Sequence, residues 1–302
     1  MSFLNNKTLY GTKTGQYIVL LLSSFLWGAS FYLTKHGLYV FTPIEANAIR
    51  LSATCIGLLP FTVMRIKHLT KEIFMYIAIV AILGNSLPQI LFTYAQQHIE
   101  SAYAAMLNSL LPVFVFLWGL YIFKEKIRTI QLLGLLVGLL GTIGLIWQSG
   151  GSVELAINGY LLLIILAHIA SGFSIMVIKH KLQILDAVSS ACFIFTFLGI
   201  PSIIYLFTMN WNEYVQHTQF YNSLFSMIAI GIGGGIFALI LFYTLIKYTS
   251  AVFASSVTYI IPIFAIMWGL GDNEKISFFH IIFTVIILTG VYLINKPKNS
   301  ES

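Results

Sequence analysis

The stretch that decides the fold is residues 94–127, YAQQHIESAYAAMLNSLLPVFVFLWGLYIFKEKI, because it recurs as residues 243–276, YTLIKYTSAVFASSVTYIIPIFAIMWGLGDNEKI. Both copies contain Ser-Ala, a Pro, Trp-Gly and Glu-Lys-Ile in the same order, 149 or 150 residues apart. A period this long in a chain of 302 residues indicates two duplicated halves and not a solenoid of short repeats.

The composition is that of a membrane protein. Hydrophobic residues make up 58% of the chain and charged residues 9%, and the mean hydropathy is +0.90. A soluble domain carries about 25% charged residues, so this chain lacks the polar side chains to cover a water-facing surface. Its net charge of +6 comes from Lys and Arg scattered at the ends of apolar runs, which favours a role in membrane orientation over nucleic-acid binding.

We therefore expect an all-α integral membrane protein with ten transmembrane helices, arranged as two inverted five-helix repeats. Each apolar run of roughly twenty residues is long enough to cross the hydrocarbon core. The predicted spans are 16–34, 43–64, 73–95, 101–123, 129–147, 158–178, 187–208, 223–246, 250–270 and 277–295. The corresponding domains are a cytoplasmic tail (1–14), repeat 1 (15–147), an extracytoplasmic linker (148–157), repeat 2 (158–295) and a second cytoplasmic tail (296–302).

The distribution of charge predicts the orientation. Most of the 16 Lys and Arg residues fall in alternate loops, whereas only Lys35 and Lys275 fall in the opposite ones. Basic loops face the cytoplasm, so both termini are predicted there. Because each half has an odd number of spans, the second half is predicted to be inverted in the membrane. The residues around the Glu of each copy agree with this inversion. Glu125 has the basic neighbours Lys124, Lys126 and Arg128, whereas Glu274 follows Asp272 and Asn273.

Polar side chains inside the spans predict a binding cavity at the interface of the halves. A polar group facing lipid is costly, so such residues turn toward the bundle interior or a wet cavity. Several share a helical face with a neighbour three or four residues away. The predicted substrate-binding residues are Trp27, Ser30, Asn85, Gln89, Asn108, His168, Ser171, Tyr243, Ser255 and Tyr259.

Residues that interrupt helices predict hinges at Pro88, Pro112, Gly233, Gly234 and Pro262. Gly134, Gly138 and Gly141 predict a small-residue face for close helix packing. Arg50 is the one cation clearly within a span, and either a contact at the membrane rim or an anionic substrate would account for it. No metal-binding spacing and no cofactor motif occurs in the sequence, so no metal and no cofactor is predicted.

Two functions other than transport through this cavity are an intramembrane protease and a membrane scaffold. Gly269–Asp272 has the Gly-x-Gly-Asp pattern of intramembrane aspartyl proteases, but that chemistry needs two aspartates in one site, and Asp186 is predicted on the opposite side. A non-transporting membrane scaffold is the second alternative. No sequence feature supports it, because no soluble domain is attached.

Both halves resemble the EamA domain of the drug/metabolite transporter superfamily. The residues that carry the resemblance are Trp27, Gly28, Ser30, Phe31, Tyr94, Ser101, Ala102, Ala105, Pro112, Glu125 and Gly134, then Tyr243, Ser250, Ala251, Ala254, Pro262, Glu274 and Gly290. The second copy departs from the pattern in having Ser171 where the first has Trp27, and neither copy has the family's Gly before the Glu (Lys124 and Asn273).

The resemblance implies a ten-helix carrier of the inner membrane, often an exporter of amino acids or other metabolites. The two inverted halves predict alternating access, and the aromatic, mostly uncharged cavity residues favour small amphipathic solutes. The carrier's expected partners are a small-molecule substrate and the lipid bilayer, with no nucleic acid, and a homodimer is left open. The substrate, the direction of transport and the coupling ion are not specified by the sequence.

Overall fold

The computed structural model describes residues 10–98, 104–105, 107–126, 128–148, 159–269, 278–294 and 296. Every regular element within these ranges is helical. The Ser-Ala pair at 101–102, residues 149–157 of the predicted linker and the loop 270–277, which holds Asp272 and Glu274, lie outside the described residues.

The first half contains five helical segments. Four of them follow the predicted spans, and the described part of the fourth in chain order is shorter than its span. Its elements are α2 (Lys13–Gly37), α3 (Pro43–Arg65), η2 (Ile66–His68), α4 (Lys71–Val80), η3 (Ala81–Ser86), α5 (Leu87–Gln96), η4 (Asn108–Leu110), α7 (Leu111–Tyr121) and α8 (Thr129–Gln148).

The second half repeats this order with an additional short helix, α12, in the loop after its second long helix. Its elements are α10 (Gly159–Lys181), α11 (Ala187–Phe207), α12 (Trp211–Val215), α13 (Phe220–Ile230), η5 (Gly231–Ala238), α14 (Leu239–Tyr248), α15 (Ala251–Ser255), α16 (Val257–Gly269) and α17 (Phe278–Ile294).

Six helical segments of the described chain are long and apolar enough to cross a membrane: Lys13–Gly37, Pro43–Arg65, Lys71–Gln96, Leu162–Lys181, Ala187–Phe207 and Phe220–Tyr248. Four further apolar helices are shorter, at Asn108–Tyr121, Thr129–Gly144, Ala251–Ala265 and Ile282–Ile294. The protein is therefore an all-helical membrane protein with several spans, and the count of ten remains a prediction.

Local sequence explains where the helices begin. At α3 the Thr42 hydroxyl accepts the backbone N–H of Glu45, and the Glu45 carboxylate accepts the N–H of Thr42 at 2.8 Å. This reciprocal capping satisfies two helix N–H groups, and Pro43 follows at the first helical position, where its missing N–H costs nothing.

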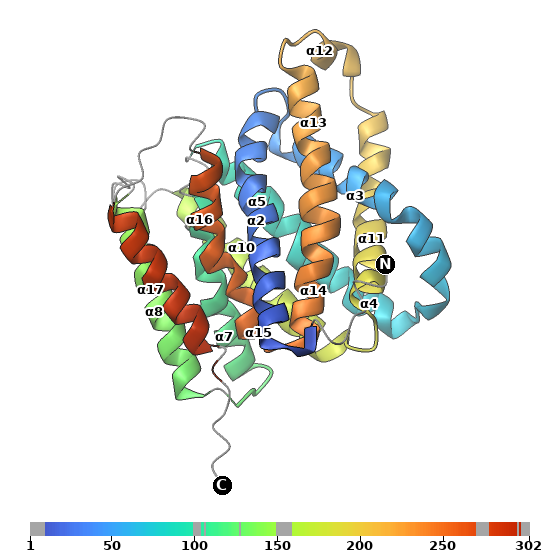
Figure 1. Ribbon diagram of the computed structural model, residues 1–302. Coiled ribbons are helices and arrows are strands. Elements are labelled where there is room, and N and C mark those ends of the chain that lie inside the picture. Colours follow the sequence, from blue (N-terminus) through green and yellow to red (C-terminus); the bar gives the residue numbers. More distant parts are fainter. Residues whose placement is uncertain are drawn as a thin grey trace.

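Helices of one half pack on helices of the other in a crosswise pattern. The first long helix of each half lies against the fourth segment of the opposite half, so α2 contacts α16 and α10 contacts α7. The second segments pair with each other, as α3 and α11, and so do the fifth, as α8 and α17. Figure 1 shows α8 and α17 side by side along one edge of the bundle and α3 with α11 toward the other.

The crosswise contacts use matching residues. A Cβ added at Gly28 would lie 2.7 Å from Phe264 Cβ, and one added at Gly172 would lie 3.0 Å from Phe114 Cβ. Phe114 and Phe264 are 150 residues apart, close to the repeat period. Gly28 therefore lets α2 approach α16 closely, and Gly172 lets α10 approach α7 at the equivalent position of the repeat.

Small residues also bring the paired edge helices together. A Cβ added at Gly290 of α17 would lie 2.5 Å from the backbone nitrogen of Gly138 and 2.7 Å from the carbonyl oxygen of Gly134, both on α8. The predicted small-residue face is confirmed, and its partner is α17. At the other edge, a Cβ on Gly199 would overlap Cys55 Cβ, so α3 and α11 also meet at a glycine.

The third helix of each half contains a π-helical segment, η3 at residues 81–86 and η5 at residues 231–238. These segments begin 150 residues apart. Wide turns of this kind displace carbonyl groups from the regular ladder, and buried carbonyls need donors. In the first segment, the Asn85 side chain donates at 3.1 Å to the carbonyl of Val80, the residue that precedes the segment.

The second π-helical segment receives its donors from the other half. Trp27 Nε1 of α2 donates to the Gly234 carbonyl at 3.2 Å, and Thr54 Oγ1 of α3 donates to the Gly231 carbonyl at 2.8 Å. The two halves are thus joined by hydrogen bonds at the place where the backbone is least regular.

We expect Gly290→Val to destabilise the protein, because the added atoms meet backbone that cannot move aside. Overpacking of this kind costs about 1–3 kcal/mol. The unfolding temperature of the purified protein in detergent measures the effect. The control is Thr289→Val on the exposed face of the same helix, and equal unfolding temperatures for the two variants would contradict the packing described above.

We expect Trp27→Phe to lower stability by removing the indole donor to Gly234. Hydrogen bonds between membrane helices contribute about 0.6–1.7 kcal/mol, so the predicted loss of unfolding free energy lies in that range. Trp147→Phe, which changes an exposed ring at the end of α8, is the matched control and should leave stability unchanged. A Trp27→Phe protein as stable as this control would refute the contribution of the bond.

Candidate functional site

A cavity of about 180 Å³ lies between the halves. Its wall comes from both halves: α2, α3, η3, α5, η4 and α7 of the first, and α10, α11, α13, η5, α14 and α16 of the second. Sites for drug-sized ligands measure about 300–1,000 Å³, so this cavity suits a smaller solute.

Eight of the ten predicted binding residues line this one cavity: Trp27, Ser30, Asn85, Gln89, Asn108, His168, Ser171 and Tyr243. They come from helical elements that are distant in sequence. The structure therefore brings most of the predicted set together, five from the first half and three from the second.

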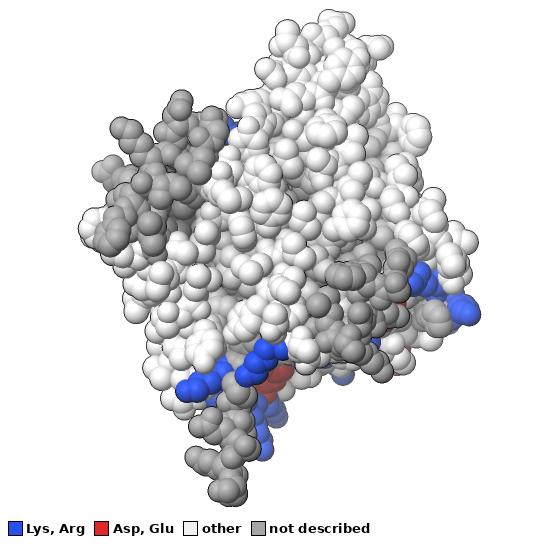
Figure 2. All heavy atoms as spheres, viewed as in Figure 1, with Lys and Arg blue, Asp and Glu red and all other residues white. Residues whose placement is uncertain are grey.

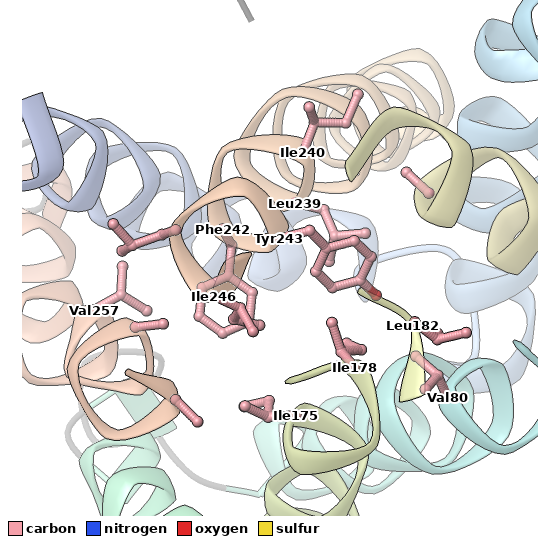
Figure 3. Packing of buried hydrophobic residues seen from close by; sticks show 14 of the residues in the cluster. Val80, Ile175, Ile178, Leu182, Leu239, Ile240, Phe242, Tyr243, Ile246 and Val257 are labelled. Carbon is pink, nitrogen blue, oxygen red and sulfur yellow. The ribbon is translucent and has the colours of Figure 1, made fainter. Parts of the chain in front are cut away.

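Asn85 and Tyr243 link the halves across the cavity. The Asn85 Nδ2 group donates to the Tyr243 hydroxyl at 3.2 Å as well as to Val80. Figure 3 shows Tyr243 projecting from α14 toward the helices that carry Val80 and Ile178. The amide and the phenol hold each other in place, and these two bonds use only the N–H groups of the Asn85 amide, which also has an oxygen acceptor.

Aromatic rings form the apolar part of the wall. Trp27 meets Phe242 edge to face, with ring centroids 5.0 Å apart, while its N–H is held by Gly234. Phe92 meets the His168 ring at 5.1 Å. Rings fixed in this way offer a rigid apolar surface at little entropic cost to binding.

His168 is held by backbone and by rings. Its Nε2 lies 3.1 Å from the Leu107 carbonyl oxygen, and Phe114 stacks on it at 6.3 Å. Asn108 follows Leu107 at the start of η4 and lines the same cavity. The hydrogen bond requires a proton on Nε2, which leaves the ring as a positioned polar group beside Asn108.

Ser255 and Tyr259 lie away from the cavity wall. The Ser255 hydroxyl donates to the Val252 carbonyl of its own helix at 2.9 Å. Tyr259 is fully buried against α8, where its ring covers Gly138 and its hydroxyl donates to the Leu135 carbonyl at 3.1 Å. Both side chains are engaged in helix packing.

The predicted hinge residues are divided between the cavity and the packed interior. Pro88 and Gly234 line the cavity, each in or next to a π-helical segment. Gly233 has open space where a Cβ would project. Pro112 opens α7, and Pro262 lies within α16, both buried.

Several lining residues were absent from the predicted binding set, among them Thr34, Arg50 and Gln96. Gln96 continues the helical face of Gln89 at a spacing of seven residues, a signal present in the sequence. Arg50 stood out as a lone cation in an apolar span. Among the described residues that line the cavity, Arg50 is the only one of a charged type (Lys, Arg, Asp or Glu).

Asp186 has a role other than the one that the protease alternative requires. It caps α11 by accepting the Ser189 N–H at 2.9 Å, and it lies 3.9 Å from Arg65. It therefore has a structural role at a loop. Asp272 lies outside the described residues.

Comparison with known proteins identifies the family. The sequence pattern described as "EamA-like transporter family" matches residues 15–147 and again residues 158–296. The predicted resemblance is confirmed.

Curated relatives are named as transporters. The "Uncharacterized transporter YoaV" of Bacillus subtilis is 23% identical, over 89% of this chain and 92% of its own. The "Uncharacterized inner membrane transporter YedA" of Escherichia coli is 24% identical, over 97% of this chain and 94% of its own.

A solved structure shares the fold. It is described as "Crystal structure of protein" and aligns with a TM-score of 0.67 over 93% of this chain and 96% of its own, at 14% identity. At that identity the likeness concerns the fold alone. The paired pattern and the relatives together decide the identity: the chain belongs to the EamA-like transporter family and is a membrane transporter, not an enzyme.

Proposed function

We propose that this chain is a secondary transporter that exports small amphipathic metabolites, amino acids among them, by alternating access of two inverted five-helix halves in the cell membrane. The observation that carries the proposal is the cavity, because both halves contribute polar and aromatic side chains to one wall. A site at the interface of two repeats is where alternating access operates, since movement of one half against the other opens it to either side.

The crosswise helix contacts support the inverted arrangement. Gly28 of α2 packs against Phe264, and the equivalent Gly172 of α10 packs against the equivalent Phe114. The third helix of each half contains a π-helical segment. Each of these contacts therefore has an equivalent when the two halves are exchanged.

The distribution of charge supports cytoplasmic termini. On the face drawn in Figure 2, Lys and Arg gather along the lower edge of the molecule, and most of the surface above it carries no charge. Basic residues concentrated at one end are expected at the cytoplasmic side of a membrane protein.

The π-helical segments are the proposed moving parts. Their backbone is less regular than an α-helix, and Gly233 and Gly234 in η5 add no side chain that would resist a change of angle. Rocking of the halves would bend the third helices there, next to the cavity, while the long helices stay rigid.

Transport by purified protein in liposomes tests the function. Asn85→Leu removes the amide that joins Tyr243 and faces the cavity, and loss of one buried hydrogen bond lowers the rate by about tenfold. Radiolabelled amino acids in a liposome efflux assay provide the measurement.

The matched control is Asn222→Leu, the same replacement at an exposed position on α13 outside the cavity lining, and it should transport at the wild-type rate. A wild-type protein that moves no solute would favour a scaffold. Equal rates for the two Asn variants would remove the cavity as the binding site.

Cysteine labelling tests the inversion separately. Lys126→Cys and Lys275→Cys change the same position of the two copies, the second outside the described residues, in a background without Cys55 and Cys192. We expect a membrane-impermeant maleimide to reach the cysteine at 275 in intact cells and the one at 126 only after lysis. Labelling of both from the same side would contradict an inverted repeat.

A further inference from the structure

Arg50 occupies an unusual position in the bundle. It lies two turns into α3 and lines the cavity. Its backbone lies at the interface of the halves, because the Thr54 hydroxyl lies 2.8 Å from both the Arg50 carbonyl oxygen and the Gly231 carbonyl oxygen of η5 and shares its one proton between them. The side chain is therefore held at the cavity, next to the π-helical segment η5 of the other half.

The Arg50 guanidinium has no counter-ion among the described residues. Its Nε is buried without a hydrogen-bond partner. Among the described residues that line the cavity there is no Asp or Glu. A guanidinium keeps its charge in proteins, and Arg50 is half-buried in an apolar span, where a charge without a counter-ion is unfavourable. Such a residue inside a membrane protein indicates that a ligand completes the pair.

Glu45, the nearest acidic residue along α3, is already engaged. Its carboxylate accepts the Thr42 N–H at 2.8 Å and the Tyr214 hydroxyl at 2.6 Å. This hydrogen bond raises the pKa of Tyr214, in the loop helix α12, to about 12, so the phenol stays protonated and keeps donating at physiological pH. Glu45 therefore caps α3 and binds α12, and the charge of Arg50 remains uncompensated.

A second donor on the cavity wall lacks an acceptor. Gln96, at the end of α5, lines the cavity, and its Nε2 is buried without a hydrogen-bond partner. Burying an unsatisfied amide costs free energy that a ligand acceptor would recover. Two donors with no acceptor among the described residues favour a ligand with oxygen acceptors and negative charge.

We propose that Arg50 and Gln96 bind the carboxylate of the transported solute, so that the cargo is a small monoanionic or zwitterionic carboxylic acid. This inference rests on the proposed transport function and specifies its substrate class. One carboxylate offers two oxygens to a guanidinium fork and neutralises its single charge. A phosphate dianion would leave a second negative charge in a wall that holds no other Lys or Arg among its described residues.

The same arrangement selects against other solutes. A cation would meet the positive guanidinium, and a neutral amide would leave it unpaired; both cost free energy relative to the carboxylate. The apolar part of the solute would face the rings of Trp27, Phe92 and Phe242 on the same cavity wall.

Efflux from liposomes containing the full-length protein tests this. The vesicles are loaded with the proteinogenic amino acids, isovalerate, leucinamide, phenylalaninamide and inorganic phosphate, and efflux is followed by mass spectrometry against protein-free vesicles. We expect every exported solute to carry a carboxylate, and each amide to leave no faster than without protein. Arg50→Gln should lower export by about tenfold or more, as loss of a hydrogen bond to a charged group predicts.

Arg50→Lys should retain part of the export, because it keeps the charge but loses the fork. Gln96→Leu should weaken it and serves as a second variant should Arg50→Gln fail to fold. Lys71→Gln, which removes an exposed charge at the start of α4, should export at the wild-type rate.

Three results would overturn the inference: export of amides or phosphate as fast as carboxylates, wild-type rates in Arg50→Gln, or wild-type rates in Gln96→Leu where the Arg50 variant is unfolded. A wild-type protein that exports nothing from the mixture would instead contradict the proposed transport function on which the inference rests.

Discussion

In a membrane, every backbone polar group must find its partner within the protein, and two π-helical segments make that demand hardest at the centre of this bundle. The first segment uses Asn85 of the same helix as a donor. The second uses Trp27 and Thr54, which belong to the other half. The second half therefore depends on the first for a satisfied backbone, so the interface between them is a condition of folding as well as the place of the cavity.

Most of the predicted polar residues of the cavity wall could be identified from the sequence, because the cost of placing a polar side chain against lipid restricts the directions it can face. Asn85, His168 and Tyr243 each lie in an apolar span, and polar groups in such spans turn toward one another. Tyr259 satisfies the same rule in a different way: it faces α8, where Gly138 makes room for its ring. The spacing of residues in the sequence predicts which side chains lie on the same face of a helix. Which other helix packs against that face depends on contacts between segments far apart in the sequence.

The extent of the π-helical segments was beyond the sequence for a related reason. Pro88 indicates a weakened ladder in the first half, and the run Gly233–Gly235 indicates the same in the second. These are chemically unlike causes, yet the resulting segments begin at residues 81 and 231, one repeat period apart. The shared geometry thus follows from the position in the bundle, where α2 and α10 press on the third helix of the opposite half.

The interface of the halves contains two kinds of contact, and they suit different amounts of movement. At its edges, Gly138 meets Gly290 and Cys55 meets Gly199 through backbone and small atoms that leave no room for displacement. At its centre, side chains such as Trp27 reach carbonyls across the cavity. In a rocking motion, displacement grows with distance from the pivot, so rigid contacts belong near the axis. Long polar side chains can exchange one acceptor for another, which allows the centre to open while the edges stay packed.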